Sequence, residues 1–278
     1  MLDLRQQYPL AGLLKVAGLA RSTFYYQQGV LQAQDKYADL KARIRELFAR
    51  HLGRYGYRRI TAAIRQTGTI VNHKTVQRLM SEMGLKSLVR PKKYRSYKGA
   101  VGRIAPNVLQ RQFEAARPNQ KWVTDVTEFN VAGEKLYLSP VLDLYNGEII
   151  AYETARRPAF EMVSNMLKKA LRRLSPKDRP VLHSDQGWQY QMPAYQRMLK
   201  QRCIRPSMSR KGNCLDNAAM ESFFGTLKSE FFYLNKFASV EELQQGLHQY
   251  IHYYNHDRIK LKLKALSPVK YRTQRYLA

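Results

Sequence analysis

Three acidic residues, Asp125, Asp185 and Glu221, have the residue types and the settings that phosphodiester chemistry requires. Breaking or joining a phosphodiester bond needs an activated oxygen nucleophile, a stabilised leaving oxygen and neutralised phosphate charge. Two divalent metal ions about 3.5–4 Å apart can supply all three. Because Mg²⁺ binds few protein groups, mostly carboxylates, and retains water ligands, the three acids predict a site of this kind.

Each of these acids also has a plainer interpretation. Asp125 lies in WVTDVTEF, where apolar neighbours make a charge costly, but it could lie on the surface of an edge strand. Asp185 ends the predicted strand VLHSD, at the kind of strand end where α/β sites collect, but an Asp before Gln186–Gly187 also favours a turn. Glu221 is one turn into a predicted helix and could face solvent.

Five further acids compete for the same role: Glu128, Asp143, Glu153, Asp216 and Glu230. Glu128 has the opposite strand parity to Asp125, so the two side chains should point to opposite faces of a sheet. Asp143 and Asp216 adjoin predicted turns, and we interpret them as local caps.

The elements that would position the acids begin at Lys121. KWVTDVTEFNV, KLYLSPVLDLY and EIIAYETA are rich in β-forming residues, with turns expected at Ala132–Gly133 and Asn146–Gly147. There follow a helix from about Phe160 to Leu174, a strand at RPVLHSD, a helix near Pro193–Gln201, a strand at IRPSMS and a helix from about Asn217. This order predicts an α/β fold, an RNase H-like mixed sheet flanked by helices. Its first and fourth strands would be neighbours, so Asp125 would face Asp185, and the last helix would bring Glu221 across.

Small helical elements of helix-turn-helix type are expected to precede this sheet. LAGLLKVAGLARSTFYYQ predicts two helices around Gly18, and KYADLKARIRELFAR, RRITAAIRQ and VNHKTVQRLMSEMG predict three more, with Asn72 as an N-cap and Gly84 as a stop. The expected domains are helical segments at 1–34 and 35–88, a basic linker at 89–118 and a catalytic core with C-terminal helices at 119–278. A helical bundle that makes no DNA contact is the alternative for the helical part.

The charge of the chain indicates a polyanionic partner. Its 278 residues include 48 Lys and Arg against 21 Asp and Glu, a formal net charge of +27. Residues 1–118 alone hold 23 of the basic and 6 of the acidic side chains. Because neutralising phosphates releases counterions, nucleic acid is the leading candidate, ahead of a merely basic protein or an anionic membrane surface. The sequence has no apolar run of membrane-spanning length and no signal-peptide pattern, and Cys203 and Cys214 are expected to be free thiols.

Several longer phrases connect these residues to a known family. They are RYGYRRI, WVTDVTEF, LHSDQGWQY, SMSRKGNCLDNAAMESFFGTLKSE and YYNHDRIKLKLKALSPVKYR. Asp185 and Glu221 are separated by 35 residues, and Lys228 follows two helical turns after Glu221 on the same face. From about residue 10 to residue 273, the chain resembles the insertion-sequence-three family of bacterial transposases, which share their catalytic core with retroviral integrases.

The resemblance implies an activity. The chain would be a DDE transposase that cleaves insertion-sequence ends and transfers the strands to other DNA, with end-joining to a circular intermediate before insertion. Asp125, Asp185 and Glu221 would be the catalytic residues and would bind Mg²⁺ or Mn²⁺, two ions per site.

It also implies partners and a location. The partners would be transposon ends and target DNA, a homo-oligomer on that DNA, and a DNA-binding protein from an upstream frame of the same element, to which frameshifting could fuse this second-frame product. The location would be the bacterial cytoplasm, at the nucleoid.

Nine residues are candidate DNA contacts: Lys228, Asn217, His183, Arg58, Arg59, Lys74, Arg78, Lys92 and Lys93. Lys228 could instead be a solvated lysine, and Asn217, one turn before Glu221, could orient a metal ligand. His183 shares a strand face with Asp185, so it could approach the scissile phosphate or be a hydrogen-bonded structural residue.

Two other functions are compatible with the sequence. A nuclease of the same fold would hydrolyse DNA without joining ends, which a strand-transfer assay with precut ends would reveal. A DNA-binding regulator with an inactive core would show no cleavage with magnesium or manganese.

Overall fold

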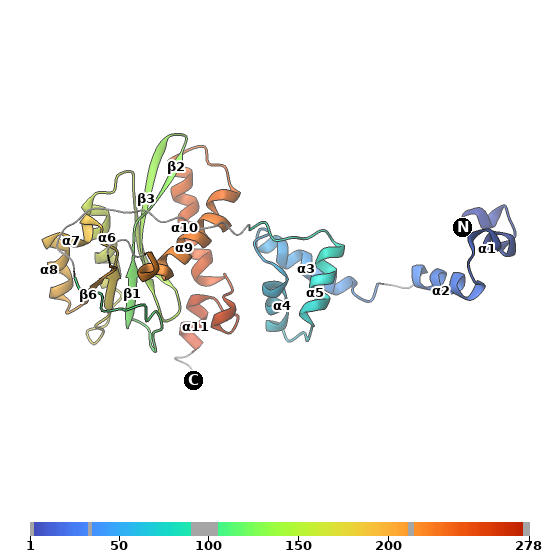
Figure 1. Cartoon of the computed structure of the whole chain (residues 1–278), viewed down its shortest axis with the longest axis horizontal. Coiled ribbons are helices and arrows are strands. Elements are labelled where there is room, and N and C mark those ends of the chain that lie inside the picture. The colour runs from blue at the N-terminus through green and yellow to red at the C-terminus, as the bar shows by residue number, and fades with distance from the viewer. Residues whose placement is uncertain (1–2, 33–34, 90–104, 211–213, 275–278) are drawn as a thin grey trace.

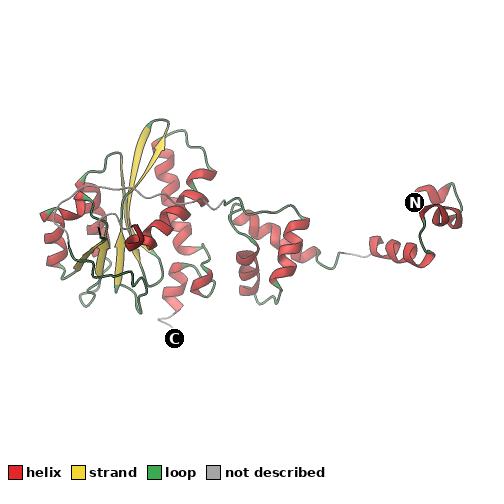
Figure 2. Cartoon of the chain, in the orientation of Figure 1, coloured by secondary structure: helices red, strands yellow, loops and turns green. Residues whose placement is uncertain are grey.

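The central feature of the computed structural model is a mixed sheet that divides helices into two layers (Figures 1 and 2). The structure describes residues 3–32, 35–89, 105–210 and 214–274. The strands are β1 (Lys121–Thr124), β2 (Thr127–Val131), β3 (Glu134–Asp143), β4 (Ile149–Ala155), β5 (Val181–Ser184) and β6 (Arg205–Met208). The predicted fold class, an α/β mixed sheet preceded by small helices, is confirmed.

β1 and β2 are two halves of one interrupted strand. Both pair antiparallel with β3, and Trp122 opposite Asp143 and Thr127 opposite Leu138 belong to the same register. The sequence predicts one continuous strand with Asp125 in its middle, and this detail is wrong. The register places Pro140 of β3 opposite Asp125, and because proline has no N–H it cannot donate a ladder bond to this residue. The Val126 N–H donates instead to the Asp125 carboxylate at 2.7 Å.

The remaining strands extend the sheet on both sides. β4 pairs antiparallel with β3 beyond the turn that contains Asn146, while β5 pairs parallel with β1, and β6 pairs parallel with β5. The expected adjacency of the first and fourth predicted strands is therefore confirmed as the β1–β5 pair.

The two faces of the sheet bury separate apolar clusters because neighbouring strand residues point to opposite sides. Val123 packs with side chains of α9 (Ala218–Glu230) and α10 (Val240–His256), whereas Trp122 packs with α6 (Phe160–Leu171), α7 (Trp188–Gln191) and α8 (Pro193–Gln201). Complete burial of one such large apolar side chain contributes about 1.5–3 kcal/mol. The helix α11 (Pro268–Gln274) follows α10.

The helical unit, residues 37–89, is built from α3 (Ala38–Arg50), α4 (Tyr57–Gln66) and α5 (His73–Glu82). The Asn72 side chain accepts a bond from the Lys74 N–H at 2.9 Å, and Gly84 has a φ of 69° just after α5, so both predicted helix signals are confirmed. Nearer the N-terminus lie α1 (Leu10–Ala17) and α2 (Arg21–Gln32), separated by Gly18 with a φ of 62°. Among the described residues, no helix is both long and apolar enough to cross a lipid bilayer.

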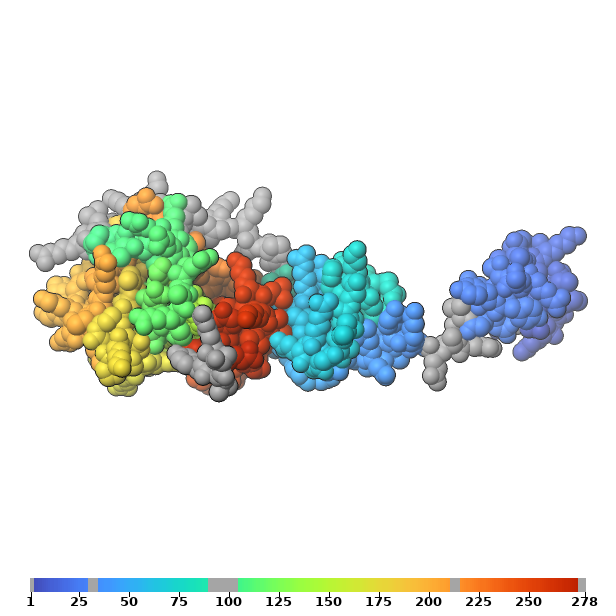
Figure 3. Space-filling model, turned by 90° about the horizontal axis from the view of Figure 1, so that it is seen from below, coloured from blue at the N-terminus to red at the C-terminus, as the bar shows by residue number. Residues whose placement is uncertain are grey.

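The helical unit packs against the C-terminal part of the chain (Figure 3). Ile259, beyond α10, is one of the buried side chains of the helical unit's own apolar cluster. The Tyr55 hydroxyl accepts from the Ile259 N–H at 2.7 Å and donates to the Asp257 carbonyl at 3.2 Å. The α/β unit, residues 105–274, and the helical unit are therefore joined by specific buried contacts.

Candidate active site

Asp125 and Asp185 occupy equivalent positions at the ends of two neighbouring parallel strands. Val123 in β1 lies opposite His183 in β5, an offset of 60 residues, and the same offset separates Asp125 from Asp185. Each Asp is the first residue after its strand, and both are half-buried. The sheet thus places two carboxylates side by side at its carboxyl edge, where α/β folds commonly bind ligands.

A glycine allows Asp185 to take its position. The Asp185 Oδ1 atom accepts a hydrogen bond from the Gly187 N–H at 2.9 Å. A Cβ atom at residue 187 would lie 2.9 Å from that same oxygen, which is shorter than the contacts that Cβ atoms make in proteins. The sequence Asp-Gln-Gly therefore forms a tight turn that fixes the carboxylate.

The charges of the three predicted acids act on one another. Burial raises the pKa of Asp125 well above its usual value, and the negative charges of Asp185 and Glu221 raise it further. Hydrogen bonds from the Val126 N–H and the Asn217 amide oppose this shift. Burial likewise raises the pKa of Asp185. The site concentrates negative charge.

Glu221 reaches the site from α9. It lies in the first turn of this helix, whose apolar side chains, including Phe223 and Leu227, pack against the sheet. After burial and the charge of Asp185, the negative charge of Glu221 also raises the pKa of Asp125. Within the described residues, however, no three acidic, histidine or cysteine side chains are already spaced to share a single metal ion.

The competing acids are all engaged elsewhere. Four of them form ion pairs: Glu128 with Lys135 at 3.2 Å, Glu153 with Lys169 at 2.8 Å, Glu230 with Arg258 at 2.6 Å, and Asp216 with Arg210 at 3.0 Å and Arg111 at 2.9 Å. The fifth, Asp143, accepts hydrogen bonds from the N–H groups of Asn119 at 2.8 Å and Tyr145 at 2.9 Å. In the described part of the chain, Asp125 and Asp185 form no ion pair. Their donor set of hard, uncompensated carboxylate oxygens fits divalent cations such as Mg²⁺.

Asn217 supports Asp125 from the start of α9. Its amide nitrogen lies 3.4 Å from the Asp125 Oδ2 atom and 3.3 Å from the Thr124 carbonyl oxygen. Its carbonyl oxygen, Oδ1, is buried and has no hydrogen-bond partner among the described residues. This geometry favours the expected alternative in which Asn217 orients a ligand.

His183 is fully buried beneath the site. Its Nδ1 and Nε2 atoms lie 2.8 Å and 3.0 Å from the hydroxyl oxygens of Ser207 and Ser209. Burial lowers the pKa of His183 to about 4, so the ring is neutral at physiological pH. These contacts favour the hydrogen-bonded structural role over an approach to the scissile phosphate.

The basic candidates lie in different settings. Lys228 is half-buried, with its ammonium 5.4 Å from the centre of the Phe129 ring. Arg58, Lys74 and Arg78 are exposed on the helical unit, although Arg78 also pairs with Glu82. Lys92 and Lys93 lie outside the described residues.

Arg59 is turned toward the α/β unit. Its guanidinium lies 3.1 Å from the Glu230 carboxylate, and the same carboxylate accepts two bonds from Arg258 at 2.6 Å and one from the Tyr250 hydroxyl at 3.1 Å. The neighbouring Arg54 donates to the Glu230 backbone carbonyl at 2.9 Å. The segment RYGYRRI by itself does not reveal this junction, and the DNA contact predicted for Arg59 remains a prediction beside the observed pair with Glu230.

An interrupted strand, a parallel neighbour and a crossing helix that together cluster three acids define a polynucleotidyl transferase core of the integrase type. Models of an integrase core domain match residues 115–214 and 221–276, and a model of an HTH-like domain matches residues 34–93. The chain belongs to the integrase-core transposases of bacterial insertion sequences, in the group that includes IS150 and IS3.

Three relatives illustrate this membership. InsK of IS150 in Escherichia coli K12, named as a transposase, is 58% identical over 99% of this chain and 97% of its own length. A transposase-like protein of Haemophilus influenzae is 58% identical over 77% of this chain and 99% of its own length. The transposase InsF of IS3A in Escherichia coli K12 is 35% identical over 73% of this chain and 71% of its own length.

Proposed function

We propose that this chain catalyses metal-dependent cleavage and strand transfer at the ends of an insertion sequence, with Asp125, Asp185 and Glu221 as the metal-binding catalytic residues. The observation that carries the proposal is the pair of aspartates at equivalent ends of β1 and β5, without an ion-pair partner in the described structure. The effect of the Glu221 charge on the pKa of Asp125 supports including the third acid.

Two divalent ions, Mg²⁺ or Mn²⁺, held by these carboxylates would offset the charge of the scissile phosphate and activate the attacking oxygen. Asn217 holds the Asp125 carboxylate through its amide, and the Gly187 N–H holds Asp185. Lys228, seven residues after Glu221 on the same helix, contacts the DNA near the reacting phosphate.

The reaction has two steps. In the first, water attacks a phosphodiester at the end of the element and leaves a free 3′-hydroxyl on one strand. In the second, this hydroxyl attacks another phosphodiester, so that one phosphorus–oxygen bond forms as another breaks. Bond number is conserved in the second step, which needs no external energy source and no covalent protein intermediate.

The DNA arrangement requires more than one copy of the chain. Pairing of two element ends is expected to occur in a homo-oligomer on DNA, in the bacterial cytoplasm at the nucleoid. An upstream-frame DNA-binding protein of the same element would be a further partner.

Three conservative substitutions test the catalytic assignment. Asp125→Asn, Asp185→Asn and Glu221→Gln should each abolish cleavage and strand transfer on duplexes that carry the element's ends, while DNA binding is retained. Glu128→Gln is the matched control because this acid is exposed and already paired with Lys135. Wild-type activity in any of the three variants would refute the role of that residue.

A precut substrate tests strand transfer separately. Duplexes with an exposed 3′-hydroxyl should become joined to target DNA when Mg²⁺ or Mn²⁺ is added. Hydrolysis without any joined product would instead identify a nuclease of the same fold.

A further inference from the structure

A buried carboxylate lies one residue before Asn217, whose amide reaches Asp125. This residue, Asp216, is fully buried in the short 3-10 helix η2 (Cys214–Asn217), which leads directly into α9. Its Oδ2 atom accepts a bond from the backbone N–H of Arg210 at 3.0 Å, and the Arg210 side chain donates to both carboxylate oxygens, at 3.0 and 3.2 Å. The segment that follows β6 is thus bonded to Asp216 through backbone and side chain.

Further donors to Asp216 come from the segment that precedes β1. Asn107 donates through its side-chain amide to Oδ2 at 2.9 Å, and Arg111 donates through Nε to Oδ1 at 2.9 Å. The bonds from Arg210 and from Arg111 hold the pKa of Asp216 well below its usual value, so the carboxylate is charged at neutral pH. Charge-assisted bonds are about twice as strong as neutral ones, so Asp216 fastens residues 107–111 to the start of α9.

The same segment is fastened to the strands behind the active site. The N–H groups of residues 108 and 109 donate to the Ser207 hydroxyl oxygen in β6 at 2.9 and 3.1 Å. That oxygen also lies 2.8 Å from the Nδ1 atom of His183 in β5, the strand that ends just before Asp185. A continuous series of hydrogen bonds therefore runs from the strand next to Asp185 to the start of α9.

Asn217 depends on this support because its own hydrogen bonds are weak. Its amide nitrogen lies 3.4 Å from the Asp125 Oδ2 atom and 3.3 Å from the Thr124 carbonyl oxygen, beyond the usual range of about 2.7–3.2 Å. Its Oδ1 atom has no hydrogen-bond partner among the described residues. The side chain does not fix its own position, so a small rotation of the backbone would carry the amide out of reach of Asp125.

We propose that Asp216 is a positioning residue for the metal site. By fixing the backbone at the start of α9, it keeps the Asn217 amide against Asp125 and so holds that carboxylate in the orientation that binds the ion. Residues 107–111 form the other half of this clamp. The proposal rests on the assignment of Asp125 to the metal site in the proposed function, and Asp216 acts through Asn217 without contacting the ion.

Binding of Mn²⁺ to the full chain without DNA tests the clamp apart from catalysis. The electron paramagnetic resonance signal of free Mn²⁺ gives the dissociation constant. Asp216→Asn removes the charge that attracts both arginines and should weaken Mn²⁺ binding by about 10–100-fold, as is typical when a metal ligand loses its support. Wild-type affinity for Mn²⁺ in a folded Asp216→Asn variant would overturn the proposal.

A double variant shows whether Asp216 acts through Asn217. Substitutions that remove the same interaction are not additive. The variant that combines Asp216→Asn with Asn217→Ala should therefore bind Mn²⁺ no more weakly than Asn217→Ala alone. Additive losses would show that Asp216 affects the site independently, and the positioning role would be wrong.

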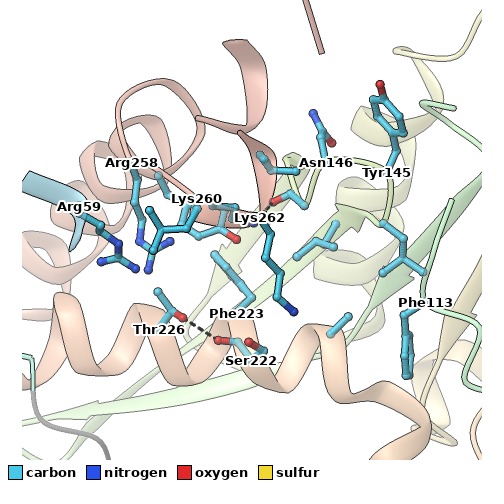
Figure 4. A pocket seen from close by; sticks show the side chains of 17 residues that line it. Arg59, Phe113, Tyr145, Asn146, Ser222, Phe223, Thr226, Arg258, Lys260 and Lys262 are labelled. Atoms are coloured by element: carbon cyan, nitrogen blue, oxygen red, sulfur yellow. Dashed lines mark hydrogen bonds between the residues drawn. The ribbon is translucent and has the colours of Figure 1, made fainter. Parts of the chain in front are cut away.

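Glu148 provides the matched control. It is also buried and is also bonded by two arginines, Arg173 at 2.9 Å and Arg272 at 2.8 Å. Asn146, labelled in Figure 4 among the residues that line a cavity beside α9, donates to its Oε2 atom at 3.2 Å. The turn between β3 and β4 that holds these residues contacts Lys121, the first residue of β1, at the opposite end from the acids.

Glu148→Gln should lower the thermal stability of the chain about as much as Asp216→Asn does, because each removes a buried carboxylate from two arginines. It should leave the Mn²⁺ affinity unchanged, since its turn is remote from the metal site. An equal loss of Mn²⁺ affinity in both variants would reduce the effect to general destabilisation and overturn the proposal.

Two other variants keep the test decisive. If Asp216→Asn does not fold, Asn107→Ala removes a neutral bond to the same carboxylate and should still lower the Mn²⁺ affinity, by a smaller factor; wild-type affinity there would refute the clamp. Asp125→Asn separates the two hypotheses. If it binds Mn²⁺ as the wild type does, the proposed function and the clamp both fail. If it loses Mn²⁺ binding while Asp216→Asn does not, only the clamp fails.

Discussion

Arg59 of α4 donates to the carboxylate of Glu230, the last residue of α9, across a sequence separation of 171 residues. Glu230 is 2% exposed, and Arg258, which binds the same carboxylate, is also buried. Although burial raises the pKa of Glu230, these two arginines hold it below its usual value. The helical unit is thus attached to the helix whose first turn carries Glu221, so its position and that of the active site are mechanically linked.

Glu230→Gln should destabilise the protein because it leaves the buried Arg258 guanidinium without a compensating charge. Removal of one partner from a buried ion pair costs about 3–5 kcal/mol. Chemical denaturation should show a loss of this size. Glu128→Gln, which disrupts the exposed Lys135 pair, should cost less than about 1 kcal/mol, and an equally small effect at Glu230 would contradict the assigned role.

Asn217→Ala should slow cleavage while leaving DNA affinity unchanged. The substitution removes the amide that reaches Asp125 Oδ2 and the Thr124 carbonyl. Loss of a residue that orients a metal ligand typically lowers metal affinity or activity by about 10–100-fold. Titration of Mg²⁺ against cleavage rate should show a higher metal requirement. Asn130→Ala, at an exposed position near the end of β2, should change neither quantity. An unchanged metal requirement in Asn217→Ala would remove its positioning role.

The junction between the two units should weaken in acid. His51 stacks on Tyr55 with ring centres 3.8 Å apart, and burial, with the nearby charge of Arg50, lowers its pKa from 6.5 to about 4. Because the neutral ring is favoured in the folded state, this contribution is complete above pH 6.5 and is lost as the pH falls through about 4. The loss amounts to at most about 3 kcal/mol.

Thermal unfolding between pH 7 and pH 4 measures this dependence. The wild type should lose stability more steeply than His51→Phe, which keeps an aromatic ring on Tyr55 but cannot bind a proton. His183, whose pKa is also lowered to about 4, gives both proteins a shared residual slope. Parallel stability profiles for the wild type and His51→Phe would contradict the prediction, because protonation of His51 would then not contribute to the loss of stability.

Most of the fold could be predicted from the sequence because its signals are local. Alternating β-forming residues, the turn at Asn146 and the cap at Asn72 depend only on near neighbours, and each of them appears in the structure as expected. The three acids could be proposed because phosphodiester chemistry restricts their type, and the predicted strand order correctly makes β1 and β5 adjacent.

The remaining features depend on contacts between distant residues. The strand opens at Asp125 because the residue opposite it in β3 is Pro140, which has no N–H, and periodicity does not reveal which residues will face each other. His183 is bonded by Ser207 of β6 and by Ser209 just after this strand, and β6 neighbours β5 only after folding. The pair of Arg59 with Glu230 joins residues 171 positions apart, so the segment around Arg59 gives no sign of it.

The burial of Ile259 within the helical unit has a consequence for synthesis of the chain. Its N–H donates a hydrogen bond to the Tyr55 hydroxyl, 204 residues earlier in the sequence. Its side chain belongs to an apolar cluster whose other buried members lie between Ile44 and Met80. When α5 has left the ribosome, the helical unit of the nascent chain still lacks Ile259. Its apolar cluster therefore stays partly exposed until the C-terminal segment emerges. Chains truncated before this point should be retained by chaperones and degraded more rapidly, so only complete translation yields a transposase with its DNA-facing and catalytic parts in place.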